Sequence, residues 1–373
     1  MTMQVPMQVV APPSGGFEGS PDSGSRIVDW VRRNLFSSTS NTLLTLLVVA
    51  AFALIVPPVF NWAIAHATIS GSDRSACTGD GACWTFIRLR LRTFFWGHYP
   101  DSELWRLALA AALMVAFSVP VLRDRTRHRG LSLLLLLTVF PLLAGTLLIG
   151  GVPGLPYVDT SQWGGLMLNI IISFVTVAGS LPFGILLALG RRSELGVVRS
   201  LSIAFIELWR GVPLLTVLFM SAVMLPLFLP HGVSIDRLIR AMAAFTLFNS
   251  AYMAETVRGA LQGVPRGQTE AALALGMHRS VAEVLVVLPQ AMRLAIPGII
   301  NIVVDLFKDT SLVTIISLID LLGAVEQALK DPAWLGFAKE GYIFTAAVFF
   351  LCCFAMSSYG RRFERRLNRH RTG

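Results

Sequence analysis

Charged side chains interrupt an apolar stretch in the C-terminal part of the chain. Asp305, Lys308 and Asp309 lie within the run 295–322, which otherwise consists mainly of apolar residues. Helix residues three and four positions apart share a face, so these charges would lie together. Because charges that face lipid are costly, this face is expected to point toward a solute pathway or a partner subunit. The alternative is a structural charge cluster near the inner membrane boundary that holds the helices together.

Further hydrogen-bonding side chains lie in two other apolar runs, 163–190 and 238–258. Asn and Ser also stabilise helix contacts in membranes, and Glu255 could pair with Arg258 instead of facing a solute. Both interpretations stay open for each residue. The candidate pathway residues are Asn169, Ser173, Asn249, Ser250, Tyr252, Glu255, Lys308, Asp309, Thr310 and Ser311.

Residue types typical of catalysis and of metal binding do not cluster in this sequence. No segment follows the pattern GxxxxGK[ST], so we expect no ATP hydrolysis on this chain. The six His residues are scattered without metal-ligand spacing, which predicts no metal site and no bound cofactor. The net charge of +9 could suggest nucleic-acid binding, but the Arg clusters flank apolar runs, which is typical of membrane orientation signals.

The composition predicts an all-α polytopic membrane protein. Of 373 residues, 54% are hydrophobic and 14% are charged, whereas a soluble domain carries about 25% charged residues. Runs of about 18 or more apolar residues predict membrane-spanning helices, and a barrel would need short alternating segments. The eight candidate spans are 42–66, 104–122, 131–150, 163–190, 205–230, 238–258, 295–322 and 342–360.

Arginine clusters indicate the orientation of these spans. They precede the first span, separate the second from the third, follow the fourth and follow the eighth. An even number of spans with both termini in the cytoplasm puts all four clusters inside. The loop 67–103 disagrees, because it should be periplasmic and yet contains four Arg residues. We interpret its segment FIRLRLRTFFWGHYP as an element lying along the membrane surface.

The same loop contains Cys77 and Cys83 in the segment ACTGDGAC. Outside the cytoplasm such a pair can form a small disulfide-closed loop. The alternatives are two free thiols or a metal pair, although no His lies nearby. Cys352 and Cys353 lie inside the last span and are expected to be packing residues.

The polar content of the spans divides the chain. We expect a disordered cytoplasmic tail at 1–40, three plain spans at 41–155, a functional region at 160–360 and a basic cytoplasmic tail at 361–373. Only the spans of 160–360 carry several polar groups, which usually mark pathways or interfaces. Within it, Glu207 and Arg210 precede Pro213, a residue that kinks helices, so these three are candidates for a gate or interface.

A polar cytoplasmic loop at 259–289 reads GALQGVPRGQTEAALALGMHRSVAEVLVVLP. Thr269 could cap a narrow, Ala-rich helix with Glu270 in its first turn and Gly276 at its end. Ser280 and Glu283 have the spacing of a capping box that starts a second helix. A slim projecting helix fits a groove in a partner, and the alternative is an amphipathic helix resting on the bilayer.

The motif residues of this loop carry a family resemblance. Glu270-Ala271-Ala272, Gly276, and then Val286, Leu288 and Pro289 resemble the EAA…G…I-LP motif of ABC importer permeases, with Val286 in place of the usual Ile. In that family the loop forms a coupling helix that docks into the ATPase subunit. The resemblance therefore assigns ATPase coupling to Glu270, Ala271, Ala272, Gly276, Met277, Leu288 and Pro289.

Four further segments resemble the polar amino-acid uptake branch of these permeases, the histidine/glutamate/glutamine/arginine type. They are IELWRGVPLL (206–215), FNSAYMAETVRGAL (248–261), LPQAMRLAIPGIIN (288–301) and LFKDTSLVTII (306–316). The long form, with three additional N-terminal spans and a GACW loop, resembles a permease of the general L-amino-acid transport systems.

The resemblance implies a five-helix type I permease core preceded by three extra helices. It implies a permease subunit, not an enzyme, that moves L-amino acids across the bacterial inner membrane by alternating access. The implied partners are a homologous second permease, a cytoplasmic ATPase dimer that holds ATP and Mg, a periplasmic amino-acid-binding protein, and membrane lipid. A secondary transporter or channel without an ATPase is the alternative; such proteins usually contain inverted repeats, which we do not find.

Overall fold

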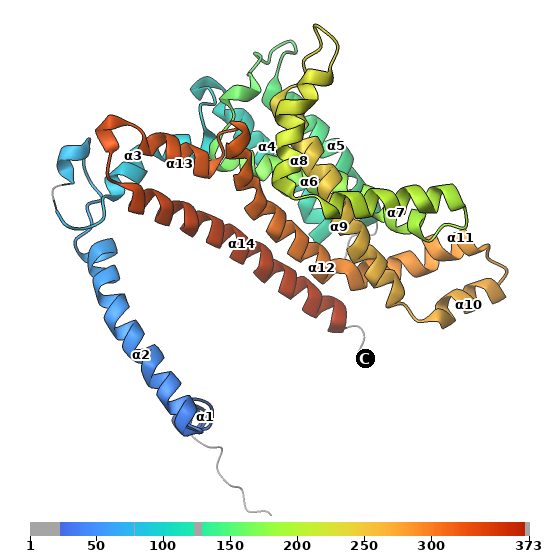
Figure 1. Cartoon of the computed structure of the whole chain (residues 1–373), viewed down its shortest axis with the longest axis horizontal. Coiled ribbons are helices and arrows are strands. Elements are labelled where there is room, and N and C mark those ends of the chain that lie inside the picture. The colour runs from blue at the N-terminus through green and yellow to red at the C-terminus, as the bar shows by residue number, and fades with distance from the viewer. Residues whose placement is uncertain (1–22, 78, 123–128, 370–373) are drawn as a thin grey trace, which may run out of the picture. The chain divides into compact units, whose positions relative to one another are not determined.

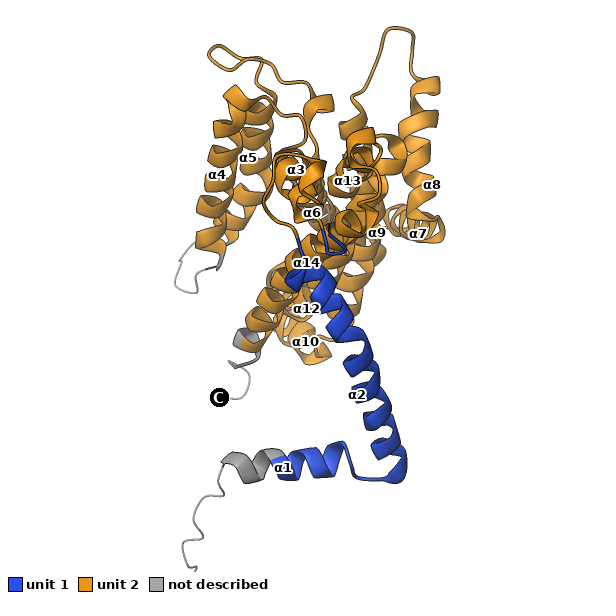
Figure 2. Ribbon diagram, turned by 90° about the vertical axis from the view of Figure 1, so that its left-hand side faces the viewer, with its two compact units in different colours: residues 1–67, 79–82 blue, residues 68–78, 83–373 orange. Residues whose placement is uncertain are grey.

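The computed structural model describes residues 23–77, 79–122 and 129–369, and the regular elements in these ranges are helices. The chain forms two compact units, residues 1–67 with 79–82 and residues 68–78 with 83–373 (Figure 2). The helices α4 and α5 therefore fold together with the region 160–360, although their composition suggested a separate addition.

Unit 1 contains two helices, α1 (Ser23–Asn34) and α2 (Thr39–Phe60), the second continued by a π-helical turn at Asn61–Ala65. The Ser38 hydroxyl caps α2 by accepting a hydrogen bond from the Asn41 amide at 3.2 Å. The described part of the segment expected to be a disordered tail is thus helical, and residues 1–22 lie outside the described ranges.

Unit 2 contains the remaining helices (Figure 1). Its α-helices are α3 (Trp84–Trp96), α4 (Leu104–Leu122), α5 (Arg129–Ile149), α6 (Gly165–Arg191), α7 (Gly196–Gly211), α8 (Leu214–Phe219), α9 (Arg237–Gln262), α10 (Arg266–Ala274), α11 (Arg279–Ala282), α12 (Leu288–Asp309), α13 (Leu321–Leu329) and α14 (Ala338–Arg369). Short 3-10 helices span Arg74–Ala76, Asp101–Glu103, Thr160–Gln162, Leu225–Phe228, Thr310–Ile316 and Pro332–Trp334, and π-helical turns span Met220–Met224 and Glu283–Val287.

Five helices in the described ranges are long and apolar enough to cross a membrane, and a bent pair makes a possible sixth. The five are Thr39–Ala65, Asp101–Val121, Gly130–Ile149, Gly165–Arg191 and Ala338–Arg365. The helices α9 and α12 have 26 and 22 residues but do not meet the same apolarity criterion. A helical membrane protein is therefore confirmed, whereas the count of eight spans is not.

Two of the predicted spans are not single straight helices. The run 205–230 breaks at Val212 and Pro213, where α7 and the segment Leu214–Phe228 meet at 100°. Pro213 has no amide hydrogen and forces extended backbone on Val212, so the helix ends there. In the run 295–322, α12 ends at Asp309 and a 3-10 helix follows, ending at Ser317 with a left-handed φ of 63°.

The helices α6 and α9 form the centre of unit 2, and small residues let them approach closely. A Cβ atom at Gly184 of α6 would lie 2.5 Å from the Cβ of Met253 in α9. Buried apolar side chains of both helices form one cluster that includes Leu168 and Phe245 and another that includes Leu187 and Ala254, which are close to this approach in the sequence. Close backbone approach through glycine is a common way to pack helices in membranes, where apolar burial gives little driving force.

One face of the helix α3 packs against the core of unit 2, and its position along the membrane surface stays a prediction. Phe86 and Phe94 are fully buried in a cluster with residues of α6, α13 and α14. On the same face, one turn from each of these Phe residues, the side chain of Arg90 forms an ion pair with Asp331. The alternation of Arg with bulky residues thus reflects a helix with one face in the protein core.

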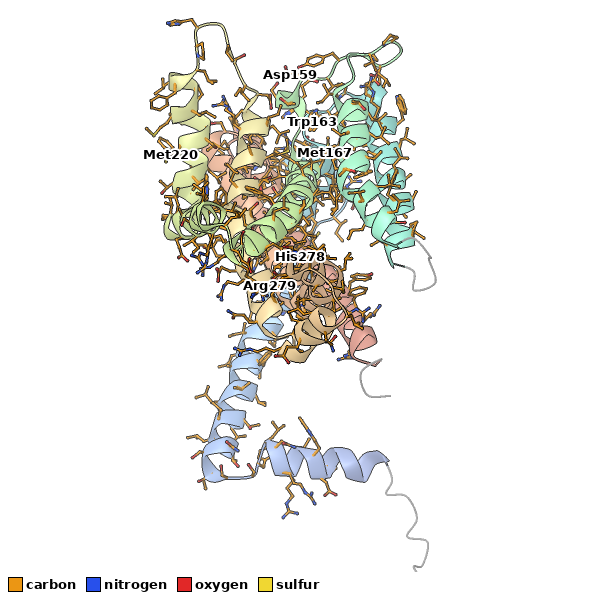
Figure 3. The ribbon with its side chains drawn as sticks, turned by 90° about the vertical axis from the view of Figure 1, so that its right-hand side faces the viewer. Asp159, Trp163, Met167, Met220, His278 and Arg279 are labelled. Carbon is orange, nitrogen blue, oxygen red and sulfur yellow. A yellow bond between two sulfur atoms is a disulfide. The ribbon has the colours of Figure 1, made fainter. Side chains whose placement is uncertain are left out.

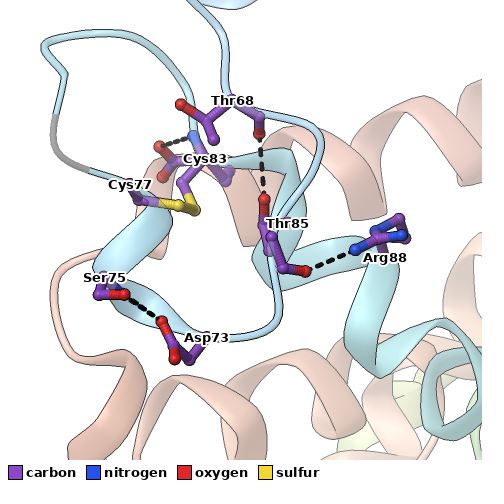
Figure 4. The surroundings of a disulfide bond; sticks show 9 residues. Thr68, Asp73, Ser75, Cys77, Cys83, Thr85 and Arg88 are labelled. Carbon is purple, nitrogen blue, oxygen red and sulfur yellow. Dashed lines mark hydrogen bonds between the residues drawn. A yellow bond between two sulfur atoms is a disulfide. The ribbon is translucent and has the colours of Figure 1, made fainter.

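The chain joins Cys77 and Cys83 by a disulfide at the start of α3 (Figure 4). Of the three alternatives for this pair, the structure therefore has the disulfide. In the same loop the hydroxyl and the amide of Ser75 donate to Asp73, and these hydrogen bonds lower the pKa of that carboxyl. Cys352 and Cys353 are free, half-buried and packed against the cluster that contains Phe86.

Candidate functional site

The loop 259–289 contains the helix α10, which begins at Arg266 directly after Pro265. Thr269 lies inside this helix, so the predicted cap by Thr269 is wrong. Pro265 fixes its own φ at −58° and presents its carbonyl to the Gln268 amide at 3.1 Å, which starts the helix earlier. Glu270 follows as the fifth helical residue and is exposed.

The C-terminal end of α10 has the geometry of a Schellman motif. The Met277 amide donates to the Ala272 carbonyl at 3.2 Å, and the Gly276 amide donates to the Leu273 carbonyl at 2.9 Å. Gly276 has a φ of +81°, which glycine adopts without strain. No atom lies within 4 Å of the position of a Cβ at Gly276, so backbone conformation and not space selects glycine.

The predicted capping box of Ser280 and Glu283 is absent. The His278 side chain instead caps α11, with its Nδ1 accepting from the Ser280 amide at 3.4 Å. Glu283 pairs with Arg192 of α6, with 2.9 Å between Nε and Oε1. After α11 the chain continues through the π-helical turn into α12, whose first turn contains Pro289 and tolerates its missing amide hydrogen.

One side of this loop packs on the protein and the other is exposed. Ala272 and Ala282 are buried, whereas Leu275 is 84% exposed and Glu270, Ala271 and Ala274 are exposed as well. His278 and Arg279 lie at the end of unit 2 remote from Asp159 and Trp163 (Figure 3). A narrow helix with exposed small and apolar residues is therefore presented at one end of the unit.

The gate candidates Glu207 and Arg210 do not pair with each other. Glu207 lies 3.2 Å from Arg191, and Arg210 lies 3.9 Å from Glu255. Glu255 also contacts Arg191 and Arg258, each at 2.7 Å, so the alternative pairing with Arg258 is the one observed. Three Arg side chains thus surround one half-buried carboxylate close to the break at Pro213.

The charges of α12 lie at the end of that helix remote from α10. Lys308 pairs with Asp305 at 2.8 Å, both side chains are more than half exposed, and this pair joins no other helix. Asp309 is half-buried, and the neighbouring Ser311 hydroxyl donates to the Lys308 carbonyl at 2.9 Å. The solute-pathway face and the structural charge cluster near the inner membrane boundary both stay predictions for these charges.

Asn169 belongs to a buried polar network. Its amide nitrogen donates to Thr310 at 2.8 Å and to Asp320 at 3.0 Å, and its oxygen accepts from the Leu321 amide at 3.1 Å. The Asp320 carboxylate also caps α13 through the Gly323 amide. The sequence interpretation missed Asp320, whose signal is an Asp directly before the short helix LLGAVEQAL.

The remaining candidates divide by exposure. Asn249 and Ser250 donate to carbonyls one turn back in α9, at Phe245 and Thr246, and both are buried. Ser173 is buried as well. Tyr252 is 36% exposed, its ring contacts that of Phe248 at a tilted angle, and the Arg210 guanidinium lies 5.9 Å from its ring centroid. Tyr252 and the charged end of α12 are thus the accessible members of the predicted set.

No group of three or more His, Cys, Asp or Glu side chains with metal-binding geometry occurs within residues 23–77, 79–122 and 129–369.

A long-helix bundle with an exposed, Gly-terminated EAA helix defines the class of membrane subunits of ABC importers. Residues 180–369 match the family described as "Binding-protein-dependent transport system inner membrane component", and the chain belongs to it. It is therefore a multipass inner-membrane transport subunit and not a catalyst. A permease of this class works with an ATPase and a binding protein.

Relatives extend the likeness to nearly the whole chain. The chain is 50% identical over 350 residues to the inner membrane amino-acid ABC transporter permease protein YhdY of Escherichia coli strain K12, covering 94% of this chain and 95% of that protein. It is 36% identical over 416 residues to the glutamate/glutamine/aspartate/asparagine transport system permease protein BztC of Rhodobacter capsulatus, covering 94% and 96%.

Among solved structures, the chain is similar to one titled "Crystal structure of an amino acid ABC transporter with histidines". The identity is 29%, the TM-score is 0.49, and the match covers 54% of this chain and 92% of that chain.

Proposed function

We propose that this chain is a permease subunit of an ATP-driven importer of polar L-amino acids, in which the α10 loop couples transport to ATP hydrolysis. The observation that carries the proposal is the exposed, narrow helix α10 with its Gly276 end and its motif residues. The whole-length relatives named for amino-acid transport support the substrate class.

The α10 loop docks into a cleft of the cytoplasmic ATPase, which holds ATP and Mg. Exposed Leu275 and Ala274 supply apolar contact, and Glu270 supplies charge near the start of the helix. Closure of the ATPase dimer moves this helix only if the docked contacts differ between the open and closed states. Ala272 and Ala282 are buried and anchor the loop to the rest of the permease.

The solute passes between this chain and a homologous second permease, after delivery by a periplasmic amino-acid-binding protein. Tyr252 and the exposed charges of α12 are the pathway residues that best fit a zwitterion, because they are accessible. The buried Asn169 and Thr310 instead join α6 to the end of α12, and the buried Asn249 and Ser250 bond to carbonyls of their own helix. In this arrangement α9 and α12 also cross the membrane, which gives eight spans with both termini in the cytoplasm.

The test is uptake of radiolabelled polar L-amino acids into vesicles containing the purified complex. The double variant Glu270→Lys with Gly276→Asp should abolish ATP-dependent uptake while membrane insertion persists. The matched control is Gln262→Ala, an exposed residue at the end of α9 outside the docking helix, which should leave uptake unchanged. Undiminished uptake by the double variant, or uptake without any ATPase, would contradict the proposal and favour a secondary transporter.

A further inference from the structure

Two consecutive arginines end α6, and their side chains reach different elements. Arg192 Nε lies 2.9 Å from Glu283 Oε1, in the π-helical turn that follows the α10 loop. Arg191 Nη1 lies 2.7 Å from Glu255 Oε1 in α9 and 3.2 Å from Glu207 Oε1 in α7. The C-terminal end of α6 therefore connects the loop to α9 and to α7, the helix that ends at the break before Pro213.

The carboxylate of Glu255 is the shared partner in this group. Only 16% of its side chain is exposed, and it accepts two hydrogen bonds from Arg258, at 2.7 and 2.9 Å, in addition to the contact with Arg191. Partly buried pairs are less screened by solvent than surface pairs, and removing one partner leaves an uncompensated charge. The link from α6 to α9 is thus stronger than a surface ion pair.

Apolar packing joins the same elements under the ion pairs. Leu187 and Ala188 of α6 share a buried cluster with Val257 of α9, and Val287 of the π-helical turn belongs to it. At Gly190 a Cβ atom would lie 2.3 Å from the Ser202 hydroxyl of α7, so α6 and α7 are also in close contact. Interfaces packed in this way shift between discrete arrangements and do not deform continuously.

We propose that Arg191 and Arg192 are positioning residues that carry the displacement of the coupling loop to α7 and α9. Glu283 moves with the loop and displaces Arg192 through their ion pair. Because Arg191 and Arg192 are consecutive at the C-terminal end of α6, a displacement of this helix end moves both and shifts Glu207 and Glu255, the partners of Arg191. Because α7 is separated from α8 by the 100° break, α7 can reorient without α8. This inference rests on the proposed function, since the ATPase supplies the displacement.

The experiment uses the complete complex in vesicles and measures ATP hydrolysis and amino-acid uptake together. The variants are Arg192→Glu, Glu283→Arg and the exchange that combines them. We expect each single variant to raise the ATP hydrolysed per amino acid transported by about fivefold, and the exchange to restore at least about half of the loss. A purely structural role would instead lower hydrolysis and uptake together.

The matched control is Arg92→Glu, which makes the same charge change as Arg192→Glu outside the docking loop. Arg92 of α3 pairs with Asp101 at 2.6 Å, but the two side chains are 43% and 75% exposed, so we expect less than a twofold change. Three results would each contradict the positioning role of Arg191 and Arg192. They are an unchanged ratio of ATP hydrolysed to amino acid transported in Arg192→Glu and Glu283→Arg, no recovery of this ratio in the exchange, and loss of the ATPase from the purified variants.

The double variant of Glu270 and Gly276 separates this failure from that of the proposed function. If that variant loses uptake while Arg192→Glu keeps the normal ratio of ATP hydrolysed to amino acid transported, only the positioning role of Arg191 and Arg192 is wrong. If the double variant transports normally, the coupling role of α10 is wrong, and so is the positioning role of Arg191 and Arg192 that depends on it.

Discussion

At the scale of single residues, the buried group of Asn169, Thr310 and Asp320 determines how the end of α12 meets α6. Asn169 uses both of its polar atoms, donating to Thr310 and Asp320 and accepting from the Leu321 amide. Asp320 accepts in addition from Thr314 and Gly323. Buried polar groups that are fully paired fix one arrangement, because any alternative leaves a donor or acceptor unpaired.

Replacing Asn169 by Ala should therefore destabilise the protein strongly. The Leu321 amide and one Asp320 oxygen lose their partner in a buried site, which costs about 2–4 kcal/mol in total. The measurement is the thermal unfolding midpoint of the purified chain in mild detergent. Ser173→Ala is the matched control in the same helix. Among the described residues the buried Ser173 hydroxyl has no hydrogen-bond partner, so this variant should change the free energy of unfolding by less than about 0.5 kcal/mol. Equal midpoints for both variants would contradict this account.

Local signals in the sequence were sufficient for some of these residues and not for others. The positive φ of Gly276 follows from its place after an Ala-rich helix, and the pair of Glu255 and Arg258 follows from i,i+3 spacing. The partners Asn169 and Asp320 are separated by 151 positions, and Arg192 and Glu283 by a long stretch as well. Such pairs depend on tertiary packing, which the sequence pattern does not contain. Thr269 was misassigned because Pro265, four residues earlier, starts the helix first.

At the scale of elements, α3 is fixed to unit 2 by three kinds of contact. Phe86 and Phe94 are buried with α13 and α14 side chains, the Cys83 amide donates to Glu340 at 3.2 Å, and Arg90 pairs with Asp331. The disulfide between Cys77 and Cys83 closes the loop just before the helix. Within this unit α3 thus belongs to the core packing.

Removing the disulfide should loosen the start of α3 without unfolding unit 2. Closing a loop this short contributes about 2 kcal/mol by restricting the unfolded chain. We expect faster amide hydrogen exchange in residues 68–90 of Cys77→Ser with Cys83→Ser, measured by mass spectrometry, and unchanged exchange in α9. Wild-type protein treated with a reducing agent should match the variant, and the reducing agent should have no effect on the variant itself. Unaltered exchange in the variant would argue that packing alone holds α3.

Element boundaries inside long apolar runs were the least predictable feature. The runs 205–230 and 295–322 stay apolar on average, so the breaks after Gly211 and Asp309 do not appear in the hydropathy. The sequence RGVP did contain a signal for the first break, because Pro213 removes an amide and extends the residue before it. The second break depends on Asp320 and Asn169 holding the 3-10 segment, which is a tertiary effect.

At the scale of the whole molecule, the fold class and the family followed from composition and one motif, whereas the number of spans did not. The helices α9 and α12 carry polar and charged side chains, and those groups lower their apolarity below that of an ordinary span. Polar side chains in a span are tolerated when they face protein or a water-filled path. The polar groups that make α9 and α12 candidates for the solute path therefore also remove the hydropathy signal of a span.

If α9 crosses the membrane, the residues before and after it lie on opposite sides. His231 and Arg266 are both exposed, and they flank α9 on its two sides in the sequence. In a background with Cys352 and Cys353 replaced by Ala, His231→Cys should react in intact cells with a thiol reagent that cannot cross the inner membrane. Arg266→Cys should react only after the membrane is opened, because the α10 loop faces the cytoplasmic ATPase. Labelling of both positions in intact cells would mean that α9 does not cross, and the inward-facing loop and the count of eight spans would then be wrong together.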